Sequence, residues 1–300
     1  MKLALFSDVH GHLRLVLHLM RCWQMKHQAE LDGALIAGDL GCFPYPAKFD
    51  KATRRWIERD PEEAGFSTFF TQPAPQTKAM LEGEFGPFSS VRCPILFVAG
   101  NHEDFAYLHS LDSTPPAAAA PEKTFPVDCY QAFHCIRDGQ VVTLQGRNGA
   151  AIKIGGLWGI ENARPDAPYR IQEQAVRNLM RQGESAFDFL LTHDAPAGVL
   201  PEGGSSQITN VIQRCQPRVH LFGHVHSARH EFGYADGATK SWIFKDVSFG
   251  PTGKDGLEGS LGVLHWDDGR CHVEIVKDQW LRQMQKHNWL QILPPCPVAT

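Results

Sequence analysis

The residues best suited to chemistry stand in five short polar clusters: SDVHG, AGDLG, AGNHE, LTHD and GHVH. Nitrogen and carboxylate ligands without thiolates suit catalytic manganese, iron, cobalt, nickel or zinc better than a structural zinc. Seven candidates exceed the needs of one ion with open positions, and a carboxylate such as Asp39 can bridge two ions about 3.5–4 Å apart. The pattern therefore predicts two divalent ions. The candidate ligands are Asp8, His10, Asp39, Asn101, His193, His224 and His226.

His224 and His226 form the last cluster, at the end of the apolar run LFG. Strand residues two apart point the same way, so both imidazoles could reach one object. The alternative is a pair of unrelated surface histidines.

Each cluster follows an element that can position it. An apolar run at residues 3–7, a helical stripe over 13–23 and a second run at 34–37 predict a βαβ unit. The runs 94–103, 187–196 and 218–227 likewise end abruptly in polar residues. In open α/β sheets, ligands bind outside the carboxyl ends of the strands. We therefore expect the clusters to converge.

The remaining apolar runs predict the rest of the fold. Runs at 150–160, 241–250 and around the Asp-Asp-Gly turn near residue 268 favour a second, more antiparallel sheet. We expect an α/β fold in which a two-sheet β-sandwich is flanked by helices. Residues 1–276 are expected to form one domain, and 277–300 a C-terminal packing helix and tail. The inward-facing residues expected in that segment are Trp280, Leu281, Met284 and Trp289.

Composition narrows the class of protein. The 300 residues are 43% hydrophobic and 21% charged, as in ordinary globular enzymes, which excludes a disordered or fibrous class. The net charge of −4 gives no general attraction to nucleic acid. The eight cysteines include no CxxC pair, and no apolar run is long enough for a signal peptide or a membrane span. These features predict a cytoplasmic protein, with no membrane association and no inferred protein partner.

Residues 41–93 form a long insertion rich in proline and aromatic residues. Insertions over a site often act as lids, so we expect a lid-like segment. Its basic run includes Arg54 and Arg55, which are candidate substrate-binding residues. The alternative is a solvated surface helix, because acidic residues such as Glu58 offset the basic run.

The five clusters, in this order, resemble the calcineurin-like metallophosphoesterase superfamily, whose pattern is D-x-H, G-D, G-N-H-[DE], a lone H and G-H-x-H. The resemblance implies a four-layer α/β/β/α fold and two metal sites that share Asp39. It implies that one ion is held by Asp8, His10, Asp39 and His226. It implies that the second is held by Asp39, Asn101, His193 and His224.

His102 has a separate role in this resemblance, because the matching histidine of the family protonates the leaving oxygen. A pKa near neutrality suits that task. Glu103 or Asp104 could orient its ring, although helix capping is equally plausible for them. The alternative for His102 is a histidine that merely closes the loop.

The function implied is hydrolysis of a phosphate ester by a hydroxide that bridges two divalent ions, with manganese favoured over iron, zinc, nickel or cobalt. Three stretches also look like RNA lariat debranching enzymes: the spacer with FSTFF, residues 141–162, and FDFLLTHDAP. We therefore favour a phosphodiesterase acting on RNA or a nucleotide. The alternatives are a phosphomonoesterase acting on a phosphoprotein or small metabolite, and a non-catalytic scaffold of the same fold.

Overall fold

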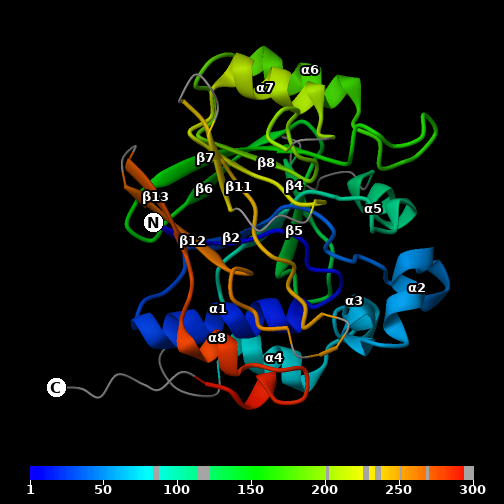
Figure 1. Cartoon of the computed structure of the whole chain (residues 1–300), viewed down its shortest axis with the longest axis vertical. Helices are drawn as coiled ribbons and strands as arrows, with labels where there is room; N and C mark the ends of the chain where they lie inside the picture. Colours follow the sequence, from blue (N-terminus) through cyan, green and yellow to red (C-terminus); the bar gives the residue numbers. More distant parts are fainter. Residues whose placement is uncertain are drawn as a thin grey trace.

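Two mixed β-sheets form the centre of the computed structural model (Figure 1). The structure describes residues 1–83, 88–113, 122–200, 203–225, 230–233, 238–250, 252–253, 255–267 and 270–293. The first sheet has the order β13-β12-β1-β2-β3-β5-β4. Its strands are β1 Lys2–Phe6, β2 Gly33–Ile36, β3 Ile95–Phe97, β4 Thr124–Pro126, β5 Phe133–Ile136, β12 Gly262–Asp267 and β13 Arg270–Ile275.

The second sheet has the order β10-β11-β9-β8-β7-β6. In both sheets the central strands run parallel: β1, β2 and β3 in the first, and β7, β8 and β9 in the second. Their residues are almost wholly buried and apolar, as expected for parallel strands covered on both faces. The strands of this sheet are β6 Val141–Gln145, β7 Ala151–Leu157, β8 Phe189–Thr192, β9 Val219–Leu221, β10 Glu231–Gly233 and β11 Lys240–Trp242.

The two sheets pack face to face, and one apolar core draws side chains from both. Gly156 of β7 lies so close to the other sheet that an added Cβ would stand 2.8 Å from the Ile136 side chain and 3.1 Å from Val98. Glycine therefore permits the close approach of the sheets at this point.

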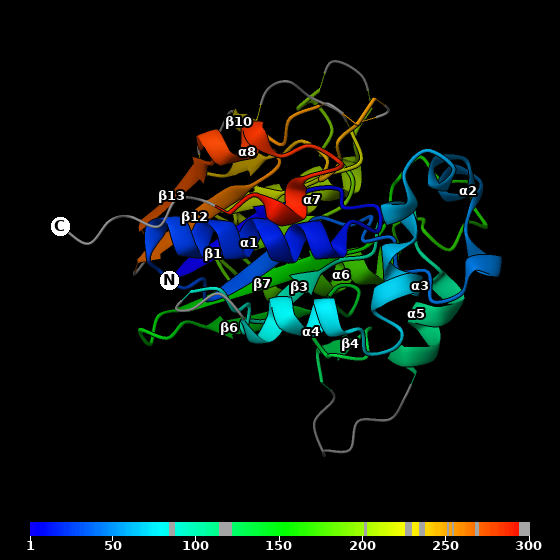
Figure 2. The same cartoon turned by 90° about the horizontal axis from the view of Figure 1, so that it is seen from below.

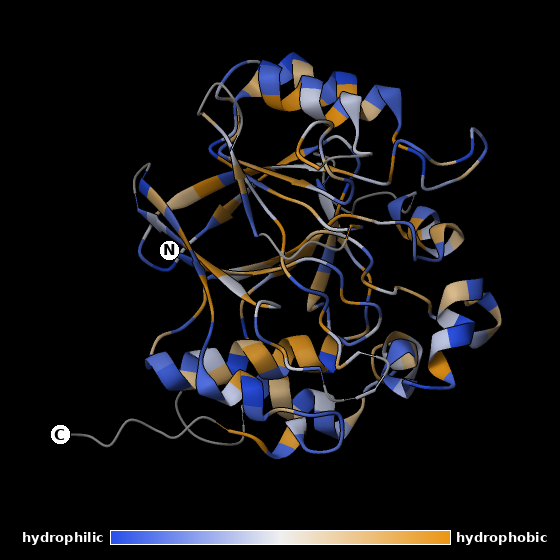
Figure 3. Cartoon of the chain, in the orientation of Figure 1, coloured by the Kyte–Doolittle hydropathy of each residue, from blue (hydrophilic) through white to orange (hydrophobic). Residues whose placement is uncertain are grey.

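Helices cover both outer faces, which completes four layers (Figures 1 and 2). Helices α6 and α7 cover the second sheet through a separate apolar cluster, while α1 packs in the core of the first sheet and α4 packs on α1. The strands between the layers are largely hydrophobic in colour, whereas α6 and α7 carry both colours (Figure 3). The expected sandwich flanked by helices is confirmed. The helices of these layers are α1 Leu13–His27, α4 Pro75–Glu82, α6 Glu173–Gln182, α7 Ser206–Cys215 and α8 Gln279–Gln283.

The insertion contributes the helices at the edge of the sandwich, and its later part is built into the core. Phe66 and Phe70 are buried, and α4 packs on α1. Its earlier part is tied down by His12, whose Nε2 lies 3.3 Å from the Asp60 carboxylate, and by the Arg14–Glu62 ion pair. The elements here are η1 Pro46–Lys48, α2 Lys51–Ile57, η2 Pro61–Ala64 and α3 Gly65–Phe69, followed after β3 by α5 Phe105–Asp112.

Two sequence predictions about the C-terminal half need correction. The β12–β13 hairpin extends the first sheet through β1, so it does not form a second, antiparallel sheet. The run 241–250 is a strand only as far as Trp242, because the N–H groups of Phe244 and Val247 donate to Ser7 Oγ and to the carbonyl of Asp8 instead of to a neighbouring strand. That loop is thereby fixed beside Asp8.

The C-terminal segment forms two short pieces, α8 and η3 Trp289–Gln291, instead of the single helix expected, and η3 packs against α1 through Trp289 and His18. All four residues expected to face inward are buried. Because the strands β10–β13 complete both sheets, we infer that residues 1–276 form one domain on which the segment after 277 packs. Within the described parts of the chain, no helix is long and apolar enough to cross a membrane.

The buried insertion can be tested with Phe70→Ala. Phe70 is fully buried and stands edge-on to Phe133 and Tyr130, so we expect the substitution to lower the free energy of unfolding by about 3–5 kcal/mol. Urea unfolding measures the change, with the exposed Gln76→Ala as the control, for which we expect less than about 0.5 kcal/mol. Equal stability of the two variants would contradict a packed insertion.

Candidate metal centre and active site

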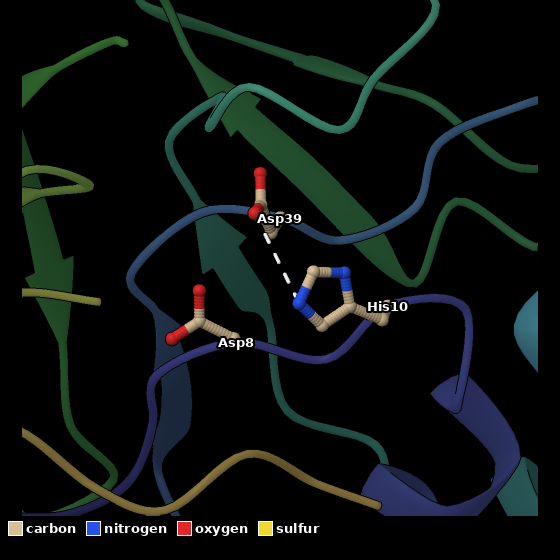
Figure 4. Close-up of side chains that lie close together, drawn as sticks. All are labelled: Asp8, His10 and Asp39. Carbon is tan, nitrogen blue, oxygen red and sulfur yellow. Dashed lines mark ion pairs between the residues drawn. The ribbon is translucent and has the colours of Figure 1, made fainter. Parts of the chain in front are cut away.

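Six of the seven predicted ligands meet at one edge of the sandwich, after the carboxyl ends of parallel strands. Sheet one supplies Asp8 and His10 after β1, Asp39 after β2 and Asn101 after β3, while sheet two supplies His193 and His224 after β8 and β9. One ligand atom each from Asp8, His10 and Asp39 lies within 4.8 Å of the others (Figure 4). His226 lies outside the described residues.

His193 stands at the centre of the cluster and is fully buried. Its Nδ1 donates to the carbonyl of Ala37 at 2.8 Å, which directs Nε2 toward the other ligands. That Nε2 lies 3.1 Å from Asn101 Oδ1 and 3.3 Å from Asp39 Oδ2, and the His224 ring is centred 5.1 Å from the His193 ring. A backbone carbonyl bonded to the far ring nitrogen is the arrangement that orients metal-binding histidines.

Asp39 lies between the two halves of the cluster. Its Oδ1 accepts the backbone N–H groups of Asn101 and His102, both at 2.7 Å. Its Oδ2 lies 3.3 Å from His193 Nε2 on one side and 4.0 Å from His10 Nε2 on the other. One oxygen is thus fixed by the backbone, while the other faces the two imidazoles that the family resemblance assigns to different ions.

Backbone strain is concentrated in the same loops. His10, Asp39 and His224 have φ values of 46°, 44° and 65°, in the left-handed region that residues other than glycine rarely adopt. Such conformations cost of the order of 1–3 kcal/mol each and gather at functional sites. At Gly100 the need is spatial, since an added Cβ would stand 2.1 Å from Asp39 Oδ1.

The buried carboxylates of the cluster favour the binding of positive charge. Burial opposes the charged form of His193, but the Asp39 and Asp8 carboxylates outweigh it and raise the pKa of His193 to about 10. Burial likewise raises the pKa of Asp8 to about 7. Nitrogen and carboxylate donors that already stabilise a proton in a buried site fit divalent cations, which would replace that proton.

His102 stands beside the cluster, and its ring is held by a residue that the sequence did not single out. Its Nδ1 lies 2.5 Å from Asp50 Oδ2, and its ring is centred 5.4 Å from that of His10. Partial burial opposes the imidazolium, but the bond to Asp50 and the charge of Asp39 raise the pKa of His102 to about 9. The bond to Asp50 therefore favours the protonated form of the His102 ring.

Neither of the residues expected to orient His102 does so. Glu103 is buried and accepts the N–H groups of Leu40 and Cys42 at 2.7 and 2.6 Å, so it fixes the loop that carries Asp39. Asp104 caps α5 by accepting the N–H of Tyr107, which is the capping alternative. The sequence pattern does not predict the role of Asp50, because its partner His102 is 52 positions away in the chain.

A cavity of about 660 Å³ opens from His10 and His102. One wall is formed by α2 and η2 of the insertion, and the other by the loop after β11. Arg54 and Arg55 are exposed and do not line it, whereas Trp56 of the same helix does. A helical wheel of α2 could have shown that Trp56 lies on a different face from Arg54 and Arg55. The remaining lining residues are Ala52, Thr53, Asp60, Glu63, Phe244, Lys245, Asp246, Ser248, Gly250 and Asp255.

Comparison with known proteins places this geometry in a family. The sequence model of the calcineurin-like phosphoesterases matches residues 1–228. A comparison with curated protein sequences gave no match. Among solved structures, the crystal structure of TT1561 of Thermus thermophilus matches with a TM-score of 0.50 and 13% identity, over 92% of this chain and 99% of that one.

The crystal structure of the hypothetical protein PH1004 from Pyrococcus horikoshii also matches, at 13% identity over 98% of this chain and 94% of that one, but its TM-score of 0.34 carries no argument. The TT1561 likeness supports the fold alone, whereas the family match spans all five polar clusters. The chain therefore belongs to the calcineurin-like phosphoesterase family and is a metal-dependent phosphoester hydrolase.

Proposed function

We propose that the protein is a phosphodiesterase, and the charge of the cavity carries this proposal. Apart from the two histidines, its described lining holds four carboxylates, one lysine and no arginine. The Lys245 ammonium also donates to the carbonyl of Gly256 at 2.6 Å. Asp60 is paired with Lys286 at 3.4 Å and burial raises the pKa of Glu63 to about 7, so the acidic character of the walls rests mainly on Asp246 and Asp255. A diester carries one negative charge and a monoester up to two, so such walls disfavour the monoester more. The carboxylates are Asp60, Glu63, Asp246 and Asp255.

The size and lining of the cavity support an ester group as large as a nucleoside. A volume of about 660 Å³ is within the range of small-molecule sites, and Trp56 offers an aromatic surface on which a base could stack. A nucleotide diester fits acidic walls better than an RNA strand, which brings a further charge with each residue. Arg54 and Arg55 would contact only a substrate that extends beyond the cavity.

We propose that two divalent ions are held as the family pattern implies, and that Asp39 serves both. Asp39 supports this, because its Oδ2 faces His10 on one side and His193 on the other. When bound, the ions neutralise the phosphate and lower the pKa of a bound water. Manganese is the favoured metal. His226 completes the proposed set.

His102 is the proposed general acid. It lines the cavity beside His10, and the bond to Asp50 raises the pKa of its ring to about 9, which favours the protonated form. A poor leaving group such as a ribose or alkyl alkoxide depends on that proton. The described part of the insertion forms one cavity wall, which supports a lid-like role for residues 41–93. The seven free cysteines of the described chain support a cytoplasmic location.

The metal ligands can be tested by Asp39→Ala. We expect this variant to lose most of its bound divalent metal, because Asp39 Oδ2 faces both proposed ion positions. Elemental analysis after dialysis measures the metal content of the purified protein. His102→Ala is the matched control and should keep it. Full metal occupancy in Asp39→Ala would contradict the shared ligand.

The substrate class can be tested with two aryl esters. In manganese, we expect kcat/KM for bis(p-nitrophenyl) phosphate to exceed that for p-nitrophenyl phosphate by about tenfold or more, which equals about 1.4 kcal/mol of preference for the monoanion. The release of p-nitrophenolate measures both. A preference for the monoester would point to the phosphomonoesterase alternative, and metal binding without activity on either ester would favour the scaffold.

The general acid can be tested through the leaving group. We expect His102→Ala to slow hydrolysis of a dialkyl or ribose diester by about 10²–10⁴-fold, while p-nitrophenyl esters lose much less because their phenolate needs no proton. Steady-state rates on both substrates measure the difference. Wild-type activity of His102→Ala on the alkyl diester would remove His102 from this role.

A further inference from the structure

Lys286 lies between α8 and η3 and contacts both walls of the cavity. We propose that Lys286 is a positioning residue of the active site. It connects the insertion with the loop after β11 and thereby fixes the width of the cavity that receives the larger ester group of a diester. This inference rests on the proposed function, because it concerns how the substrate is held. Lys286 lies beyond residues 1–228, which the family model matches.

The first contact of Lys286 is with the insertion. Its ammonium lies 3.4 Å from Asp60 Oδ1 and donates to the carbonyl of Arg59. The side chain of Asp60 is only 11% exposed and lines the cavity, and its Oδ1 also accepts the N–H of Glu62 at 3.3 Å. The bonds of Lys286 therefore hold the turn that joins α2 to η2.

The second contact of Lys286 is with the loop after β11. The N–H of Lys286 donates to the carbonyl of Gly253 at 3.4 Å, and a Cβ added at Gly253 would stand 3.4 Å from Cβ and Cδ of Lys286. Gly253 lies between Gly250 and Asp255, which line the cavity, and its N–H donates to the carbonyl of Gly250 at 3.1 Å. The aliphatic part of the lysine thus packs on one wall while its ammonium binds the other.

The segment that carries Lys286 is itself anchored on both sides. Met284 and Trp289 are buried in the core that both sheets share, and Trp289 packs against α1 (Figure 2). Arg282 adds an ion pair with Glu258 of the loop after β11, at 2.7 Å. The lysine side chain therefore extends from a backbone that is held in place, and it can fix the distance between the walls.

Fixed walls favour a substrate that contacts both of them. If the walls were mobile, the free energy of ordering them would be subtracted from the binding energy of such a substrate. Trp56 lines one wall and Phe244 the other, and a nucleoside offers a base and a sugar to contact both, whereas a methyl group does not. The contacts described for Lys286 involve no metal ligand. Its loss should therefore raise KM for a large diester and leave kcat unchanged.

Lys286→Met tests this connection, because it removes the ammonium and keeps a long side chain. On thymidine 5′-(p-nitrophenyl) phosphate we expect KM to rise about 3–10-fold, with kcat within about twofold of wild type. On methyl p-nitrophenyl phosphate, which has the same leaving group, KM should rise by less than about twofold. Lys286→Arg keeps the charge and should restore the wild-type KM. Lys277→Met, at an exposed lysine before α8, is the matched control and should change neither KM.

Hydrogen exchange gives a readout that does not depend on activity. In Lys286→Met the N–H groups of Glu62 and Gly253, one on each wall, should exchange faster by about tenfold, because the walls open locally more often. Metal content should stay at the wild-type value. Lys286→Gln provides a second neutral variant should methionine fold poorly.

An equal rise in KM for both diesters would overturn the proposal. Both carry one negative charge, so the unpaired carboxylate of Asp60 would by itself repel them equally. Unchanged exchange at Glu62 and Gly253, or the same losses in Lys277→Met, would also overturn it. A wild-type enzyme that hydrolyses neither diester would instead overturn the proposed function, while the exchange measurement would still test the connection between the walls. The two failures are therefore distinguishable.

Discussion

The rest of the site depends on how the two carboxylate oxygens of Asp39 are used: one is bound by the backbone, and the other faces the imidazoles. Oδ1 is bound to two consecutive N–H groups of the loop after β3, which leaves no room for a side chain at Gly100. Oδ2 is consequently fixed between imidazoles from the two sheets. The left-handed backbone at Asp39 is the cost of this placement, and Glu103 stabilises it through the N–H groups of Leu40 and Cys42.

Burial makes this arrangement electrostatically demanding. Asp8, Asp39 and His193 are buried together, and the two carboxylates raise the pKa of His193, so charge is compensated locally. Charge is compensated in the same way beside the cluster, where the Asp50 carboxylate stabilises the positive charge on His102. Positive charge is thus retained at the inner end of a cavity whose walls are acidic.

The sequence predicts the parts of the structure that depend on local pattern. The strands before Asp8, Asp39 and His193 are continuous apolar runs, and the convergence of their ends follows from the direction of parallel strands. Predictions that need tertiary knowledge did less well. The β12–β13 hairpin has an antiparallel pattern that says nothing about which sheet it joins. Ile243, Phe244, Val247 and Phe249 are buried as parts of a loop, and an apolar pattern alone does not distinguish a buried loop from a strand.

Long-range pairs explain the remaining omissions at the site. The orientation of His102 by Asp50 joins an insertion to a strand end, and the cavity-lining Trp56 lies among basic residues that drew attention away from it. The basic run suggested nucleic acid, whereas the wall facing the site is acidic. Net charge along a sequence is therefore a poor guide to the charge of a surface that only folding assembles.

The placement of the ligands on both sheets has a consequence for how the protein matures. The described cluster draws on positions from 8 to 224, so it does not exist until nearly the whole sandwich has closed. Ions that need the complete set of ligands bind the native state and not its precursors. They therefore increase the stability of the native state only after folding. The chain must therefore reach its topology without help from bound metal. Bound metal then stabilises a structure whose two sheets are already in close contact at Gly156.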